Sequence, residues 1–209
     1  AADNMGAGIF LVTDTAGEPN DLIIRNVLFQ NNQYAIYVYN SNINRTLIED
    51  CRFESSTYNG IYYRYGGEAS TIQRSAFINN GSHGILFRTG GQSSNLTINY
   101  CLFYGNAGNQ IDASASTCAT GLKLYNNTVD GGIDLTGAST ETVRNNYFKS
   151  LTSAATASNN LDIDTITTAN HFQNYAANDY RLKSTAYSSI NQGYNVSLTS
   201  DFAGTSVPQ

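Results

Sequence analysis

Tyrosine, arginine and aspartate side chains recur at one place in a repeating pattern, and they are the residues of this chain that could do chemistry. Each lies one or three positions after an isoleucine or leucine that returns at long, regular intervals. The successive pairs are Phe10 and Val12, Tyr37 and Tyr39, Tyr62 and Arg64, Leu86 and Arg88, Asp112 and Ser114, Asp134 and Thr136, and Asp162 and Asp164. Their character changes from aromatic to basic to acidic, which predicts a graded strip along one face of the protein.

The aromatic and basic part of this strip has the side chains of a carbohydrate-binding surface. The rings of Tyr37, Tyr39 and Tyr62 can stack on sugar rings, since a tyrosine combines an apolar face with a polar hydroxyl. Arg64 and Arg88 can bind the carboxylate of a uronate or a sulfate group. The alternative interpretation is a solvated sheet face, on which rings stack across strands and arginines and aspartates balance one another's charge.

The acidic part of the strip could hold a metal ion. Asp134, Asp162 and Asp164 would place carboxylates about 5 Å apart if they belong to consecutive coils of the repeat. Ca²⁺ binds several carboxylate oxygens at once, so a shared ion is within reach of such a group. We therefore expect either no cofactor or Ca²⁺ at these aspartates.

Two pairs in the strip could support catalysis on a polysaccharide. A lyase needs a base beside a cation that neutralises the substrate carboxylate, and Arg88 with Asp112 is the best pair for it. A glycoside hydrolase needs two carboxylates that face one cleft, and Asp112 with Asp134 is the best pair for that. Neither pair has a supporting local motif, so an enzyme is the alternative interpretation, with a lyase placed before a hydrolase.

Composition limits the partners of the chain. Its 209 residues carry 11 Lys and Arg against 16 Asp and Glu, which gives a net charge of −5. Nucleic acids and anionic membrane surfaces need clustered basic residues, so neither is expected as a partner. No stretch is long and apolar enough to span a bilayer. A charge-poor composition rich in Asn, Ser, Thr and Gly is typical of secreted β-solenoids, and it predicts a secreted or cell-surface protein.

The three cysteines, Cys51, Cys101 and Cys118, form no metal-ligand spacing such as C-x-x-C. Their odd number excludes complete pairing within the chain. A bridge between Cys101 and Cys118 and a set of buried free thiols are the two alternatives.

A ladder of isoleucines must position the strip. Its members are Ile9, Ile36, Ile61, Ile85, Ile111, Ile133 and Leu161, separated by 27, 25, 24, 26, 22 and 28 residues. A second register precedes each of them, with an apolar residue, usually a polar turn residue, and then usually an aromatic residue, as in Ile24-Asn26-Phe29 and Ile48-Asp50-Phe53. Three short strands and three turns account for intervals of this length. The fold is therefore predicted to be all-β, a single-stranded right-handed parallel β-helix of about seven coils with three short strands per coil.

Alternation along each strand predicts which residues point inward. The residue two positions after each ladder member is apolar or aromatic throughout the chain. These residues are Leu11, Val38, Tyr63, Phe87, Ala113, Leu135 and Ile163.

The coils resemble the repeats of the pectate-lyase-like right-handed β-helix superfamily, whose strands often read N-x-F-x-x-N…G-I. The ending resembles the terminal coil of that superfamily, with Asp-Tyr-Arg-Leu at 179–182, Ile-Asn-Gln-Gly at 190–193 and Asp-Phe-Ala-Gly at 201–204. An arginine commonly follows the last element, and Thr205 stands there instead. The expected organisation is β-helix coils over residues 1–168 and a closing coil, cap and tail over residues 169–209. The resemblance specifies fold rather than function, because this fold hosts lyases, hydrolases, adhesins and fibres.

Two histidines are interpreted as structural. His83-Gly84-Ile85 resembles the Gly-His-Gly element of polygalacturonase-like glycosidases, but Ser82 replaces the first glycine. The paired-Asp and Arg-x-Lys elements of those enzymes are also absent from the sequence. We therefore interpret His83 as a turn residue and His171 as packing in the cap.

The beginning of the chain shapes the preferred function. Ile9 already belongs to a ladder strand, so we expect an uncapped first coil with an open sheet edge. Such an edge predicts either the C-terminal piece of a longer β-helix or end-to-end stacking on an identical chain, which would give a filament. The preferred function is thus a secreted structural or binding β-solenoid that self-assembles. The alternative is a polysaccharide-degrading enzyme or carbohydrate-binding β-helix that uses the strip from Tyr37 to Asp164.

Overall fold

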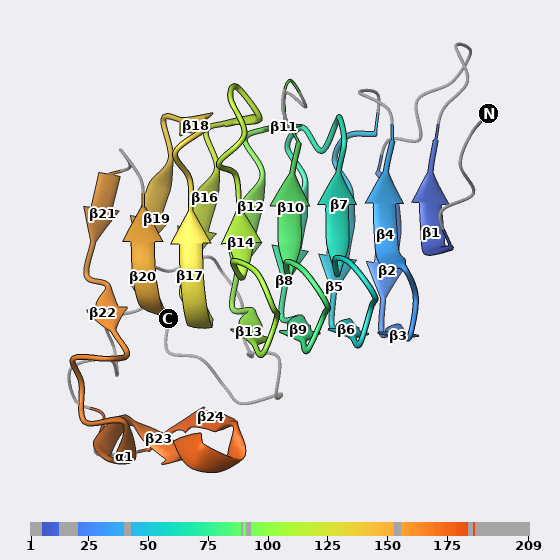
Figure 1. Ribbon diagram of the computed structural model, residues 1–209. Coiled ribbons are helices and arrows are strands. Elements are labelled where there is room, and N and C mark those ends of the chain that lie inside the picture. The colour runs from blue at the N-terminus through green and yellow to red at the C-terminus, as the bar shows by residue number, and fades with distance from the viewer. Residues whose placement is uncertain are drawn as a thin grey trace.

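The computed structural model describes residues 6–12, 21–39, 43–88, 90, 93–152, 156–183 and 186. Over these residues the chain winds into a parallel β-solenoid, with the strands of successive coils side by side (Figure 1). In this part of the chain no helix combines the length and apolar character that a membrane span requires.

The strands form three parallel sheets. The seven-stranded sheet contains β2 (Ile23–Arg25), β5 (Leu47–Glu49), β8 (Thr71–Gln73), β12 (Thr97–Asn99), β16 (Lys123–Tyr125), β19 (Thr142–Arg144) and β21 (Thr156–Ser158). The three-stranded sheet contains β11 (Ser93–Ser94), β15 (Ala119–Thr120) and β18 (Ala138–Ser139).

The twelve-stranded sheet forms two walls of the solenoid. The first wall contains β1 (Ala7–Leu11), β4 (Tyr34–Val38), β7 (Ile61–Tyr63), β10 (Ile85–Phe87) and β14 (Ile111–Asp112). The second wall contains β3 (Leu28–Gln30), β6 (Arg52–Glu54), β9 (Ala76–Ile78) and β13 (Leu102–Tyr104). The walls meet in the longer strand β17 (Thr128–Asp134), which pairs with both and with β20 (Tyr147–Thr152), and β20 in turn pairs with β22 (Leu161–Asp162). The first two described coils, β2 to β4 and β5 to β7, therefore have the three short strands that the sequence predicts, and the next two add β11 and β15 as a fourth.

The isoleucine ladder is confirmed over most of its length. Successive strands place in register Ile9, Ile36, Ile61, Ile85, Ile111 and Ile133. The members from Ile36 to Ile133 are at most 2% exposed. Burial of one such side chain stabilises the fold by about 1.5–3 kcal/mol, so the ladder is a main source of stability.

The inward partners of the ladder are buried as predicted in the middle of the solenoid. Those from Val38 to Leu135 are at most 2% exposed. Leu11 in the first strand is partly exposed and packs against the same core. Ile163 is buried in a second, smaller cluster with residues of the closing segment.

The predicted number of coils is wrong, because the structure has about five turns rather than seven. The six isoleucines in register enclose five turns, and the chain then shortens its path. Leu151, not Leu161, lies beside Ile133, and Leu161 pairs with Tyr147 in the other wall. The shorter last coil therefore moves the predicted seventh ladder member out of the ladder.

Sharp corners between strands are made by residues in the left-handed region. One corner holds Asn26, Asp50, Arg74, Tyr100, Asn126, Asn145 and Asn159, with φ between 46° and 58°. Inside this corner Asn127, Asn146 and Asn160 form a column. The Oδ1 atom of Asn146 accepts from the backbone N–H of Asn127, and its amide donates to the carbonyl of Leu124, both at 2.9 Å. Side-chain amides thus satisfy the backbone groups that the corner leaves without strand partners.

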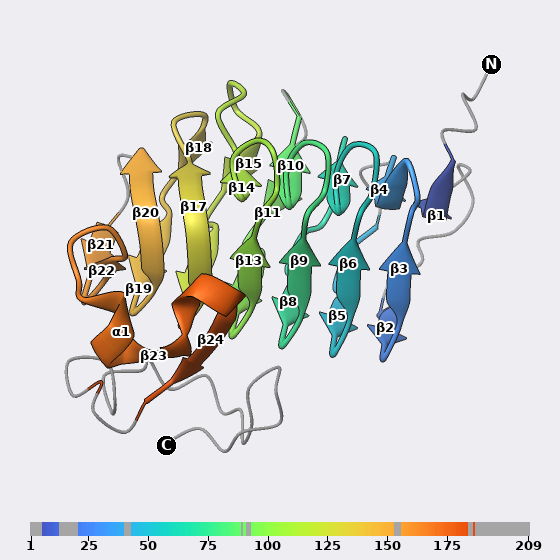
Figure 2. The same ribbon diagram turned by 60° about the horizontal axis from the view of Figure 1, so that its bottom comes forward.

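The closing segment folds back along the side of the solenoid (Figure 2). It consists of α1 (Thr168–His171), β23 (Phe172–Asn174), the 3-10 turn η1 (Tyr175–Ala177) and β24 (Asp179–Leu182). The fully buried Phe172 lies 5.1 to 5.8 Å, between ring centroids, from Tyr147, Tyr175 and Tyr180. His171 packs here as expected, with its Nδ1 3.0 Å from the hydroxyl of Tyr147. The other two closing elements of the sequence, at 190–193 and 201–204, lie outside the described residues.

All three cysteines are buried free thiols, so the alternative of a Cys101–Cys118 bridge is wrong. Burial raises the pKa of Cys118 to about 11. A thiol with so high a pKa stays protonated at neutral pH, and it is therefore a poor nucleophile.

Candidate functional site

The outer face of the first wall carries the predicted strip as two neighbouring columns. The column one position after the ladder contains, in register, Phe10, Tyr37, Tyr62, Leu86, Asp112 and Asp134. The column three positions after the ladder contains Val12, Tyr39, Arg64, Arg88, Ser114 and Thr136. Backbone hydrogen bonds from Tyr39, Arg64 and Arg88 to the preceding coil keep this second column aligned. The five predicted carbohydrate-binding residues therefore lie on one surface.

Tyrosine rings from several coils pack together on this face. Around Tyr37, ring centroids lie at 5.3 Å for Phe10, 5.4 Å for Tyr34 and 4.9 Å for Tyr62. Tyr37 itself is only 2% exposed, so it supports its neighbours and has no free ring face for a ligand. Tyr58 stacks on Tyr34 at 5.2 Å and is 47% exposed. The rings that a ligand could reach are therefore those of Tyr58 and of the half-buried Tyr39 and Tyr62.

Arg64 and Arg88 contact tyrosines instead of carboxylates. The guanidinium carbon of Arg64 lies 4.4 Å from the ring centroid of Tyr39, and its buried Nε has no hydrogen-bond partner among the described residues. The exposed Arg88 hydrogen-bonds to the side chain of Tyr62. Neither forms an ion pair within the described part of the chain. In contrast, carboxylates neutralise Arg25, Arg45, Arg52, Arg74 and Arg181.

We call this group of side chains the tyrosine–arginine surface. It consists of Tyr34, Tyr37, Tyr39, Tyr58, Tyr62, Arg64 and Arg88. It combines open ring faces with two positive charges that have no carboxylate partner among the residues that the structure describes. Guanidinium groups bind carboxylate and sulfate oxygens with directed hydrogen bonds. The surface can therefore hold a polymer that offers both apolar ring faces and negative charge.

Asp112 and Asp134 are neighbours in register, but each carboxylate is engaged in its own turn. Asp112 Oδ1 accepts hydrogen bonds from the Ser114 backbone N–H at 3.1 Å and from the Ser114 hydroxyl at 2.7 Å. Asp134 Oδ1 accepts from the Thr136 N–H at 3.0 Å and from the Thr136 hydroxyl at 2.8 Å. The second oxygen of Asp112 accepts from Asn109 at 2.8 Å.

These contacts bear on a catalytic role for Asp112. Burial raises the pKa of this carboxyl, but the hydrogen bonds from Asn109 and Ser114 outweigh burial and hold the pKa below its usual value. A general acid in a glycoside hydrolase needs a raised pKa, so that it still carries its proton near neutral pH. Asp112 is therefore suited to closing its turn and not to donating a proton.

His83 lies closer to Asp112 than its place in the sequence suggests. Its Nδ1 is 3.7 Å from Asp112 Oδ2 and 3.2 Å from the carbonyl oxygen of Asn109. The residue beside Asp112 in the preceding strand is Leu86, so Arg88 lies next to Ser114 instead. The structure thus brings a histidine, and not the predicted arginine, to this carboxylate.

The three aspartates predicted to share Ca²⁺ are not brought together. Thr152 lies beside Asp134 in the next coil, whereas Asp162 pairs with Phe148 in the second wall. Asp162 Oδ1 instead accepts a hydrogen bond from the backbone N–H of Asp164 at 2.9 Å. Across the described ranges no group of three or more His, Cys, Asp or Glu side chains could hold a metal ion.

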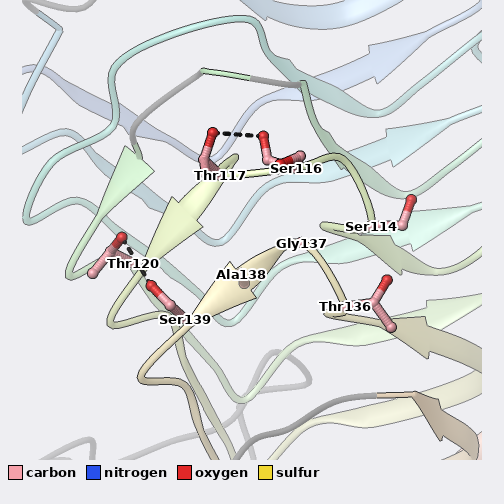
Figure 3. Close-up of a pocket in the computed structure, with 8 residues that line it drawn as sticks. All are labelled: Ser114, Ser116, Thr117, Thr120, Thr136, Gly137, Ala138 and Ser139. Carbon is pink, nitrogen blue, oxygen red and sulfur yellow. Dashed lines mark hydrogen bonds between the residues drawn. The ribbon is translucent and has the colours of Figure 1, made fainter.

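A pocket continues the strip beyond the arginines (Figure 3). Its volume is about 410 Å³, and its lining residues are Ser114, Ser116, Thr117, Thr120, Thr136, Gly137, Ala138 and Ser139. They come from strands β15 and β18 and from the loops that precede them. Six of the eight carry a hydroxyl group and none carries a charge.

Sequence reasoning missed Tyr34 and Tyr58 because it read only the positions after each ladder isoleucine. Both tyrosines precede the ladder, Tyr34 by two positions before Ile36 and Tyr58 by three before Ile61. This recurrence of tyrosine was the available signal. The pocket had no such signal, because serines and threonines are common in every turn of the chain.

Comparisons with known proteins support the fold. The family described as "Right handed beta helix region" matches residues 2–148, which is more than half of the chain. No curated protein matched, and no solved structure matched.

Proposed function

This chain belongs to the right-handed β-helix family, and we propose that it is a secreted member that binds an acidic polysaccharide without cleaving it. The observation that carries the proposal is the tyrosine–arginine surface, where two arginines have tyrosine neighbours and no carboxylate partner among the described residues. An acidic polymer supplies the missing negative charge, and its sugar rings cover the exposed tyrosines.

Binding is favoured over catalysis by the state of the aspartates. Both oxygens of Asp112 accept hydrogen bonds, and Asp134 is held in the turn that it closes. The guanidinium group of Arg88 has hydrogen-bond donors only and no acceptor atom, so it offers no site that takes a proton from a substrate. The pairs Arg88 with Asp112 and Asp112 with Asp134 thus lack the poised proton transfer that a lyase or hydrolase requires.

Isothermal titration calorimetry of the protein with polygalacturonate, at low and at high salt, tests the proposal. The double variant Arg64→Gln, Arg88→Gln should bind at least about tenfold more weakly, which corresponds to two lost charge-assisted hydrogen bonds. Arg52→Gln is the matched control, because that exposed arginine lies on the second wall and pairs with Glu54.

Binding by the wild type should weaken as salt screens the arginines, and it should be unchanged by EDTA, because the arginines need no metal. A wild type that binds neither this polymer nor other acidic glycans would refute the proposal. An equal loss for Arg52→Gln would also refute it. Release of unsaturated sugar products would show catalysis and would replace binding with a lyase function.

A second candidate function, end-to-end assembly, is favoured by exposed apolar side chains in the first coil. Val12, Ile23 and Leu28 are 51%, 58% and 57% exposed, whereas Leu102, in register with Leu28 further along the second wall, is 5% exposed. These side chains belong to or follow β1, β2 and β3, which lie on three different walls and each pair on one side only among the described residues. Such an open sheet edge is a surface on which a further coil can stack. Sedimentation over a range of concentrations tests this, with Leu28→Lys expected to abolish the larger species. A wild type that stays monomeric throughout would contradict assembly.

A further inference from the structure

We propose that the hydroxyl-lined pocket holds an uncharged sugar unit of the bound polymer, directly next to the unit whose acid group contacts Arg88. The inference rests on the proposed function and makes the polymer more specific. It implies a heteropolysaccharide in which a neutral unit follows an acidic one, as opposed to a polymer of uronates alone.

The pocket and the tyrosine–arginine surface are continuous with each other. Asp112 lies in register with Leu86 and with Asp134, so Ser114 and Thr136, two residues further on, continue the second column after Arg88. Neighbouring coils are about 4.8 Å apart, which is close to the length of one sugar unit. A chain running along the column therefore passes from Arg88 into the pocket within one or two units.

The direction of the hydrogen bonds at the rim of the pocket determines which ligand groups the rim can bind. The hydroxyl of Ser114 donates to Asp112, and that of Thr136 donates to Asp134. Their hydrogens are used, so the two oxygens can only accept from a ligand. A sugar hydroxyl or an amide N–H can donate to them, whereas an ionised carboxylate or a sulfate group cannot.

Negative charge beside the pocket also favours an uncharged sugar unit there. The two aspartates place negative charge directly behind the rim, and the lowered pKa of Asp112 keeps its carboxyl ionised at neutral pH. None of the eight lining residues is basic, so nothing in the lining offsets this charge. An acidic unit is repelled from the pocket, while Arg64 and Arg88 attract it one or two coils away.

The volume and the polarity of the pocket agree with an uncharged sugar unit. A volume of about 410 Å³ accommodates one or two sugar rings, and strands β15 and β18 offer further hydroxyls. Thr120 and Ser139 face each other there, with their oxygens 3.2 Å apart (Figure 3). One of these two hydroxyls donates to the other, so the pair has one hydrogen left for a ring oxygen, and both oxygens can accept from a sugar hydroxyl.

The experiment compares two polymers of equal length by calorimetry. Hyaluronan oligosaccharides alternate a uronate with a neutral N-acetylated sugar, whereas polygalacturonate oligosaccharides carry a uronate at every unit. The wild type should bind the alternating polymer about tenfold more tightly, which corresponds to a few additional hydrogen bonds.

Two variants and a control assign the preference to the pocket. Ser139→Leu fills the pocket from an exposed position, and Thr136→Val removes one rim acceptor at constant size. Each should abolish the preference while leaving the affinity for polygalacturonate unchanged. Ser94→Leu is the matched control, since Ser94 lies beside Thr120 in the same sheet but outside the pocket.

The outcomes separate the two proposals. Binding of both polymers with equal strength, or with a preference for polygalacturonate, overturns this inference and leaves the proposed function standing. Equal effects of Ser139→Leu and Ser94→Leu on the preference also overturn it. Failure of the wild type to bind either polymer overturns the proposed function and this inference with it.

Discussion

Glu49 is a carboxylate with almost no access to water, and its contacts show how a charge-poor solenoid handles charge. It is 4% exposed, and its oxygens accept from Gln73 at 2.7 Å and from Arg25 and Arg74 at 2.5 Å each. Burial raises the pKa of Glu49, but hydrogen bonds from Gln73 and Arg25 and the charge of Arg74 outweigh it and lower the pKa. The carboxylate is therefore a structural group shared between three coils.

Replacing this carboxylate should destabilise the fold measurably. Glu49→Gln should reduce the free energy of unfolding by about 1–3 kcal/mol at pH 7, because buried donors lose their charged acceptor. Glu54→Gln is the control, since its partner Arg52 is half exposed and such pairs contribute about 0–1 kcal/mol. Urea denaturation measures both variants, and equal losses would contradict the structural role of Glu49.

The same residue predicts a pH dependence. A lowered folded pKa means that the contribution of Glu49 is complete above its unfolded pKa of about 4.3 and is lost as pH falls through the folded value. The stability difference between wild type and Glu49→Gln should therefore shrink below about pH 4. A difference that stays constant in acid would show that the effect comes from packing and not from the charge.

Residue types at fixed offsets were enough to predict which side chains share the outer face, from Tyr37 to Thr136. They were not enough to predict which of them a ligand can reach. Tyr37 is buried by its neighbours, Asp112 closes its own turn, and His83 approaches that carboxylate from the preceding coil. These outcomes depend on side-chain rotamers across coils, which a periodic pattern does not contain.

At the scale of elements, one carboxylate adds polar contacts to the apolar packing that holds the closing segment on the solenoid. Asp130 in β17 accepts from the hydroxyls of Tyr175 at 2.8 Å and Tyr180 at 2.5 Å, and Lys149 lies 2.6 Å away. His171 adds a further polar contact to Tyr147. Local opening of such a segment needs less free energy than unfolding of the whole protein.

Asp130→Asn should release the closing segment without unfolding the coils. Hydrogen exchange should accelerate in residues 172–182 and stay unchanged in β5 to β13, because the asparagine keeps the size but loses the charge that binds Lys149. Asp134→Asn is the control, because Asp134 lies in the part of β17 that pairs with the first wall. Unchanged exchange in the segment, or faster exchange everywhere, would contradict this anchoring role.

The strands were predictable because their period is set by the core, and the exceptions have a local cause. The step from Ile133 to Leu151 is shorter than every earlier step, since β17 and β20 each replace two strands and a corner by one longer strand. The longer spacing of the earlier ladder members therefore placed the next one at Leu161 instead of Leu151. The closing segment is joined to the side of the solenoid by Asp130, Tyr175, Tyr180 and an apolar cluster around Phe172, and such single contacts carry no repeat that a sequence pattern could reveal.

At the scale of the whole molecule, stability should depend on position along the solenoid. Phe77 stacks between Phe53 and Phe103 at 4.6 Å on both sides, whereas the ring of Phe29 stacks only on Phe53 among the described residues, at 5.0 Å. In repeat proteins each unit is stabilised mainly by its neighbours. A central member of the column therefore contributes more than a terminal one.

Phe77→Ala should lower the free energy of unfolding by about 3–5 kcal/mol, the usual range for a fully buried phenylalanine. Phe29→Ala should cost clearly less, because only one ring contact is lost. Urea denaturation measures the pair. Equal costs would show that the solenoid unfolds as one unit in which position has no influence.

The corners of the early coils share one step length, and this has a consequence for how the protein can change over generations. Side chains at three successive corners accept from the coil before, Ser70 from Thr46, Ser75 from Cys51 and Asn80 from Ser56, each across 24 residues. A tandem duplication of one such stretch would add a complete layer while every existing neighbour kept its place. Gene slippage could thus lengthen or shorten the tyrosine–arginine surface by whole coils, and selection could match the surface to ligands of different length.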